Sequence, residues 1–140
     1  MVCCEGTGAD IGAMLRELAV SDEARGNEMV QILYGLSFNP DQQQATWDWV
    51  SKEMEAILAR IPTWRQGAIV TTHAGACSAE HAEKVRAEFE KIIEGLEGGR
   101  RYMAQTLEGI EVCAELKRIK GGEIDRYFQD PPDPDEEPQT

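Results

Sequence analysis

Apolar residues recur at helical spacing through most of the chain. Two early segments place them at positions i, i+3, i+4 and i+7: Ile11, Met14, Leu15 and Leu18 in the first, and Met29, Ile32, Leu33 and Leu36 in the second. In a helix with 3.6 residues per turn, this spacing gathers the apolar side chains on one face. We therefore predict two amphipathic helices, each burying a single stripe.

A third helix is marked at both ends by proline. Asn39 is a favoured N-cap residue, Pro40 suits the first helical position, and Pro62 ends the pattern. The apolar stripe between the two prolines comprises Trp47, Val50, Met54, Ile57, Leu58 and Ile61. We predict one helix here, with a length of about 30 Å at 1.5 Å per residue.

Residues 67–72 are rich in β-branched side chains, but no other segment offers a strand to pair with them. A short buried helix is therefore predicted in place of a strand. Ser78 follows as the N-cap of another helix, which is expected to end at Gly95. The inward positions of that helix are Val85, Phe89, Ile92 and Ile93.

The last helix is predicted to begin after the break at Gly98 and Gly99. Its apolar positions are Met103, Leu107, Ile110 and Ala114, and its last turn holds Lys117, Arg118 and Lys120. Basic side chains favour the negative end of a helix dipole, and glycine commonly follows a helix end. We therefore expect this helix to stop at Gly121 and Gly122, with one further turn around Ile124, Tyr127 and Phe128.

Together these elements predict an all-α fold of antiparallel helices, either a superhelical bundle or a section of α-solenoid. A single helical domain is expected over residues 10–128. Residues 1–9 are read as a flexible lead-in. Residues 129–140 contain many prolines and acidic side chains, so we expect a disordered tail that buries no apolar surface.

The net charge of the chain limits the classes of partner that it is expected to bind. The 140 residues carry a formal net charge of −12, which is expected to repel both a nucleic-acid backbone and an anionic membrane surface. No apolar run approaches the roughly 20 residues that a bilayer span needs, and the N-terminus lacks a secretory pattern. We therefore expect a cytoplasmic protein whose four cysteines are thiols.

The densest group of reactive side chains is HAGACSAEH, at residues 73–81. His73 and His81 are eight residues apart, so on one continuous helix they would be about 12 Å apart along the axis and could not share a tetrahedral ion. The chain has neither an H-E-x-x-H nor a C-x-x-C motif. We interpret the segment as a helix junction, with Cys77 as a small buried residue. No metal or cofactor is expected in this chain; the alternative is a small metalloenzyme using His73, Cys77 and His81.

Two of the tryptophans lie close together on the predicted third helix. Trp47 belongs to its core stripe, whereas Trp49 lies about 200° around the helix from Trp47. Trp49 is therefore the candidate for a surface contact with a partner protein. Catalytic residues are not identified by any motif in the chain.

Several short patterns come in a recognisable order. They are N-P-x-x-x-x-x-x-W-x-x-V from Asn39 to Val50, V-x-x-x-F at Val85 and Phe89, and L-E-x-I from Leu107 to Ile110. Together they resemble the C-terminal helical domain of M1-family zinc aminopeptidases of the puromycin-sensitive and endoplasmic-reticulum type. The resemblance covers about residues 20 to 119. Where that family often has Asn and Trp after L-E-x-I, this chain has Cys113 and Leu116.

The resemblance implies an arch of antiparallel helices related to HEAT and armadillo repeats. In the family, this domain closes over a separate catalytic domain that holds the zinc, and it encloses the peptide cavity. The resemblance therefore implies a non-catalytic lid domain that controls substrate access, with the catalytic domain and the peptide substrate as partners. The alternative is a free-standing helical-repeat interaction module with no peptidase role.

Overall fold

The computed structural model describes residues 8–131, and within that range the chain forms helices and no strand. The prediction of an all-α fold is confirmed. The elements are α1 (Gly8–Val20), α2 (Gly26–Ser37), α3 (Gln43–Lys52), α4 (Met54–Arg60), the 3₁₀ helix η1 (Thr63–His73), α5 (Ala79–Phe89), the 3₁₀ turn η2 (Ile93–Gly95) and α6 (Gly99–Gln129).

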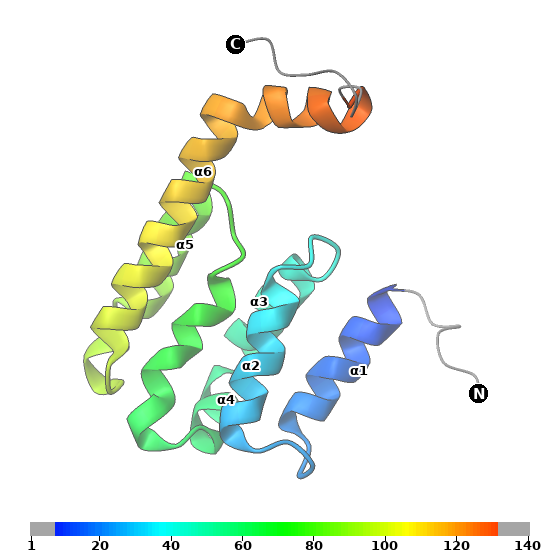
Figure 1. Ribbon diagram of the computed structural model, residues 1–140. Coiled ribbons are helices and arrows are strands. Elements are labelled where there is room, and N and C mark those ends of the chain that lie inside the picture. Colours follow the sequence, from blue (N-terminus) through cyan, green and yellow to red (C-terminus); the bar gives the residue numbers. More distant parts are fainter. Residues whose placement is uncertain (1–7, 132–140) are drawn as a thin grey trace, which may run out of the picture.

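The helices form two layers. In Figure 1, α1, α2, η1 and α6 lie side by side in that order, and α3, α4 and α5 lie behind them. The contacts agree, because α1 packs on α2, α2 on η1, and η1 on α6, while α5 packs on both η1 and α6. From α2 onward, the chain therefore passes alternately between the front and the back layer.

The core lies between the layers, with η1 near its centre. Ile69 and Val70 of η1 are fully buried, as is Phe89 of α5. Gly67 permits close packing of η1 on the start of α6, because a Cβ atom at this position would lie 2.4 Å from the carbonyl oxygen of Glu97. The prediction of a short buried helix at residues 67–72 is confirmed, and its type is 3₁₀.

The helix predicted between Pro40 and Pro62 forms as two helices, α3 and α4. Asn39 does not cap it directly, because its side-chain oxygen accepts from the Asp41 N–H in a turn, and α3 begins only at Gln43. Glu53 separates α3 from α4, although backbone hydrogen bonds from Glu53 to Trp49 and from Ile57 to Glu53 continue the helical pattern across it. The end before Pro62 is as predicted.

Other boundaries differ from the predictions by a few residues. α1 begins at Gly8, inside the predicted lead-in. The Ser78 N-cap is confirmed, since its side chain accepts from the His81 N–H at 3.1 Å. However, α5 ends at Phe89, and the segment to Gly95 is a turn followed by η2.

The predicted stop at Gly121 and Gly122 is wrong, because α6 continues to Gln129. Side-chain contacts bridge the glycine pair: Lys120 forms an ion pair with Glu123 at 2.9 Å, and Arg126 donates to the Gly122 carbonyl oxygen at 3.1 Å. The C-terminal half of α6 extends beyond the body and bends (Figure 1). We call residues 112–129 the arm.

The apolar stripes predicted for the first two helices differ in how far they are buried. In α2, Met29, Leu33 and Leu36 are buried, as expected. In α1, at the edge of the front layer, Met14 is 67% exposed and Ile11 is 45% exposed. The α1 stripe, which also includes Leu18, therefore lies partly uncovered in the described part of the chain.

Candidate functional site

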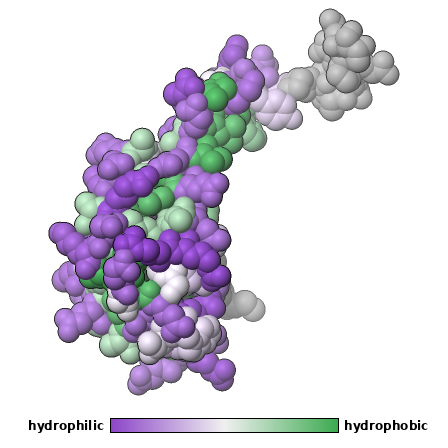
Figure 2. All heavy atoms as spheres, turned by 90° about the vertical axis from the view of Figure 1, so that its left-hand side faces the viewer, coloured by the Kyte–Doolittle hydropathy of each residue, from purple (hydrophilic) through white to green (hydrophobic). Residues whose placement is uncertain are grey.

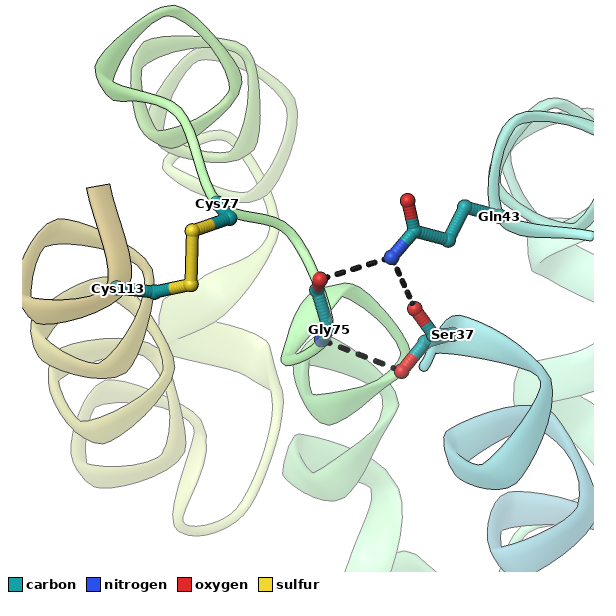
Figure 3. Close-up of a disulfide and its surroundings, with 5 residues drawn as sticks. All are labelled: Ser37, Gln43, Gly75, Cys77 and Cys113. Atoms are coloured by element: carbon teal, nitrogen blue, oxygen red, sulfur yellow. Dashed lines mark hydrogen bonds between the residues drawn. A yellow bond between two sulfur atoms is a disulfide. The ribbon is translucent and has the colours of Figure 1, made fainter. Parts of the chain in front are cut away.

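The HAGACSAEH segment forms the junction between η1 and α5. η1 ends at His73, the chain turns through residues 74–78, and α5 begins at Ala79. Hydrogen bonds hold this turn against the end of α2 and the start of α3 (Figure 3). The Gln43 side-chain nitrogen donates to the carbonyl oxygens of Ser37 and Gly75, both at 2.8 Å.

Gly75 is the point of closest approach in the turn. Its N–H donates to the Ser37 hydroxyl oxygen at 3.3 Å (Figure 3). A Cβ atom at residue 75 would lie 1.9 Å from the Ser37 carbonyl oxygen, so no other residue fits without displacing backbone. The sequence therefore needs glycine here to pack the junction onto α2.

Cys77 and Cys113 form a disulfide, so the prediction that these cysteines are thiols is wrong. Their Cα atoms are 5.1 Å apart, within the usual range for a disulfide. The bond joins the turn before α5 to the middle of α6 (Figure 3). Cys77 and Cys113 are 36 residues apart. Neither lies in a short motif that would have signalled the pairing.

The turn also brings the two histidines together. His73 Nδ1 and His81 Nε2 are 2.9 Å apart, a hydrogen-bond distance, so one nitrogen carries the hydrogen and the other accepts it. The separation of about 12 Å expected on a continuous helix does not apply, because the chain reverses between them. His73 is 2% exposed, whereas His81 is half-buried.

Aromatic rings surround the histidine pair. The Trp47 ring lies 4.1 Å from that of His81 and 5.8 Å from that of His73, centroid to centroid, and the Phe89 and His73 rings form a T-shaped pair with centroids 5.6 Å apart. The Trp47 ring N–H donates to the Thr72 carbonyl oxygen at 2.9 Å. The core position predicted for Trp47 is confirmed.

This setting disfavours protonation of both histidines. Burial, and then the neighbouring His81, lower the pKa of His73 from 6.5 to about 3. Burial and Lys84 also lower the pKa of His81, against the opposing effect of Glu80. His73 Nε2 is buried and has no hydrogen-bond partner among the described residues. A proton added to the pair would meet a desolvated ring beside another imidazole, so protonation is expected to loosen the junction.

The geometry supports the junction interpretation. Within residues 8–131, no three His, Cys, Asp or Glu side chains are grouped closely enough to hold a metal ion. Cys77, the third residue of the metalloenzyme alternative, is bonded to Cys113 instead. What the site offers chemically is a pair of imidazoles, one buried and one half-buried, that responds to protonation, next to a disulfide that responds to reduction.

The other predicted features lie apart from this site. Trp49 is half-buried and packs at the margin of the core, so its role as a partner contact stays a prediction. Trp64, the third tryptophan of the chain, is 63% exposed at the start of η1. Cys3 and Cys4 and most of the acidic tail lie outside the described residues.

Comparison with known proteins gives no relative. No family model, no curated protein and no solved structure matches the chain. Over residues 8–131, no helix combines the length and apolar character that crossing a bilayer requires.

Proposed function

We propose that this chain is the non-catalytic C-terminal lid domain of an M1 zinc aminopeptidase. In this proposal the domain encloses the peptide cavity and controls substrate access, while a catalytic domain outside this chain supplies the zinc and the chemistry. The helices would belong to a HEAT or armadillo-like α-solenoid. The sequence patterns that carry the resemblance are packing residues: Trp47, Val85 and Phe89 are all buried, and the rings of Trp47 and Phe89 contact the histidine pair.

The observation that carries the proposal is the uncovered apolar stripe on α1. Solenoid proteins bury a continuous core by stacking helices, and an end helix with a polar outer face closes the stack. α1 lies at one edge of the front layer, yet Ile11, Met14 and Leu18 share one of its faces and remain exposed. A face of this kind suits stacking against further helices, as expected for one part of a larger arch.

The alternation of the chain between two layers also supports the proposal. The order α2 in front, α3 and α4 behind, η1 in front, α5 behind and α6 in front is the path that helical repeats follow. A free-standing interaction module would share this path. The two proposals therefore differ mainly in what covers the α1 stripe.

The decisive experiment uses an M1 aminopeptidase fragment that retains its N-terminal and catalytic domains but lacks its C-terminal domain. The purified 140-residue chain is added, and binding is measured by calorimetry together with hydrolysis of peptides of increasing length. We expect binding and a change in the dependence of the rate on peptide length. Met14→Glu is expected to weaken binding at least about tenfold, because it places a charge in an apolar contact.

The matched control is Phe128→Glu, which places the same charge on an exposed apolar position of the arm, far from α1 in the sequence. It is expected to leave binding to the catalytic fragment unchanged. No binding at about 100 µM, or equal loss with both variants, would contradict the lid proposal. The chain alone is expected to show no stoichiometric zinc and no aminoacyl hydrolysis; zinc-dependent turnover lost in His73→Ala would instead favour the metalloenzyme alternative.

The predicted cytoplasmic location stays a prediction, and the disulfide bears on it. Disulfides persist in oxidising compartments and are rare in a reducing cytoplasm. A cytoplasmic form of this protein would therefore hold Cys77 and Cys113 as thiols. Labelling of free thiols in protein taken directly from cells, followed by mass spectrometry, distinguishes the two states.

A further inference from the structure

The arm of α6 carries a row of exposed apolar side chains, which we call the arm face. Their exposed fractions run from 44% to 78%, and the residues are Val112, Leu116, Ile119, Ile124, Tyr127 and Phe128. Figure 2 shows apolar surface continuing up the arm between flanking hydrophilic side chains. No other helix of the described chain packs along this length of α6, where every residue from Glu115 to Lys120 is exposed.

The exposed area is comparable to one side of a protein interface. Six large side chains that each expose on the order of 100 Å² present roughly 600 Å² together. A standard interface buries about 800 Å² per partner, and apolar patches of several hundred Å² usually mark a contact site. The arm face alone therefore supplies most of the apolar surface that a dimer of ordinary affinity needs.

The arm face is not flat but contains a groove. Leu116, Ile124, Tyr127 and Phe128, together with Lys120 and Glu123, line a groove of about 390 Å³. Val112 and Ile119 stand beside this groove on the same helix and lie one turn away from Leu116 on either side. One arm thus offers both projecting side chains and a groove that can receive them.

We propose that the arm face is the docking surface for a second copy of this chain, with the two α6 arms packed antiparallel. Such a contact is isologous, so it closes as a two-fold dimer and does not extend into a filament. In the register that sets Val112 opposite Phe128 of the second copy, Leu116 lies opposite Ile124. Val112 of each arm then meets the Phe128 end of the other arm's groove, and Ile119 lies level with Gly121.

The charges on the two arms partly offset each other in this arrangement. In the same register Lys117 lies level with Glu123 of the second copy, and the two-fold repeats that pair of opposite charges, whereas Glu115 lies level with Asp125. Lys120 meets its own counterpart at the two-fold axis, where the ion pair with Glu123 within each chain offsets the repulsion. The apolar row therefore provides most of the contact, and the Lys117–Glu123 pairs favour its register.

The distribution of charge along the chain also favours the arms over the bodies as the contact. Residues 112–129 contain four basic and three acidic side chains, a net charge of +1, whereas residues 1–111 carry −8 and residues 130–140 carry −5. Two bodies that each carry −8 repel each other. Antiparallel arms place the bodies at opposite ends of the contact, where the repulsion is weakest.

The test is sedimentation velocity of the 140-residue chain over a range of concentrations up to about 200 µM. All samples carry Cys3→Ser and Cys4→Ser, so that an intermolecular disulfide at these positions cannot produce a dimer. We expect a reversible dimer with a dissociation constant in the micromolar range. Leu116→Glu and Phe128→Glu are each expected to weaken it at least about tenfold.

Met14→Glu is the matched control, because Met14 is exposed on α1 to a similar degree and lies outside the arm face. It is expected to leave the dimer unchanged. Lys117→Glu and Glu123→Lys should each weaken the dimer, and the double variant should restore it. Circular dichroism checks that every variant folds.

A monomer throughout the concentration range would overturn the proposal. So would a dimer that survives both Leu116→Glu and Phe128→Glu, or one that Met14→Glu abolishes. The proposal is independent of the lid function, because that function is tested through α1 and a catalytic fragment, whereas the dimer is tested through the arm and the chain alone.

Discussion

The junction around His73 and the arm of α6 are stabilised in opposite ways. At the junction, a disulfide, the hydrogen bonds of Gln43 and Gly75, and a cluster of aromatic rings converge on nine residues. In the arm, every large apolar side chain is at least 44% exposed, and beyond Cys113 the side-chain contacts that stabilise it, such as the ion pair between Lys120 and Glu123, come from within the helix. The contacts at the junction fix a single conformation, whereas the apolar side chains of the arm are not covered by any other described helix.

This difference shows that an apolar stripe in the sequence does not by itself show that its side chains are buried. α2 and the arm both present apolar side chains at helical spacing, yet Met29 is fully buried and Leu116 is 54% exposed. Burial depends on whether another element of the chain lies alongside. Substitutions of the same type in the two regions should therefore have very different effects on the free energy of unfolding.

The largest contrast is expected between two phenylalanines. Phe89→Ala removes a fully buried ring beside His73 and should lower the free energy of unfolding by about 3–5 kcal/mol. Phe128→Ala removes a ring that is 78% exposed and should change the free energy of unfolding of the monomer by less than about 0.5 kcal/mol. Urea unfolding followed by circular dichroism measures both. Equal effects would mean that the arm packs on the body.

Removing the disulfide is expected to have the next largest effect. Cys113→Ser opens a loop whose ends are 36 residues apart, and loss of the chain-entropy contribution predicts a fall of about 3–4 kcal/mol in the free energy of unfolding. Thermal unfolding with and without a reductant provides the comparison for the unaltered chain. If Cys113→Ser matches the oxidised protein in stability, Cys77 and Cys113 do not constrain the unfolded chain.

A glycine pair gives the third contrast. Gly75→Ala pushes a Cβ atom into the Ser37 carbonyl oxygen and should cost about 2–3 kcal/mol, because backbone must move. Gly122→Ala in the arm meets nothing within 4 Å and should instead stabilise the chain by about 0.5–1 kcal/mol through helix propensity. Chemical denaturation of both variants measures whether the free energy of unfolding falls in Gly75→Ala and rises in Gly122→Ala. Loss of stability in Gly122→Ala would show a constraint on the arm that its exposure does not reveal.

The smallest predicted effect is a dependence on pH. The pKa of His73 is lower in the folded protein than its ordinary value of 6.5, so its contribution to stability is fully present above about pH 6.5 and is lost as pH falls from there towards 3. The free energy of unfolding should drop by about 2 kcal/mol by pH 5. His73→Phe keeps a ring that cannot titrate and should make the curve shallower between pH 7 and 5, leaving only the contribution of His81, whose pKa is also lowered. An unchanged slope would place the titrating group elsewhere.

Local signals predicted most of the secondary structure. Ser78 was identified as an N-cap because its residue type and the following glutamates are a local pattern, and the end before Pro62 follows from the geometry of proline. The stop at Gly121 was wrong because glycine disfavours a helix by only about 1 kcal/mol, and nearby side-chain contacts continue across it.

The candidate site was harder to predict, because its contacts are not local. The meeting of His73 with His81 depends on a chain reversal that Gly75 allows. Glycine is required at residue 75 because Ser37, 38 residues earlier in the sequence, packs directly against it. The Cys77–Cys113 pairing likewise depends on how α5 and α6 pack. Spacing along the sequence carries no information about such distances once the helix is interrupted.

The position of the disulfide also determines what would survive cutting of the chain. Cys113 is the second residue of the arm, so the covalent cross-link ends almost where the exposed helix begins. A protease acting after Lys117, Arg118 or Lys120 would release the distal arm as a peptide. The remaining body would keep its cross-linked loop and its core, and it would lose most of the arm face together with the acidic C-terminal residues.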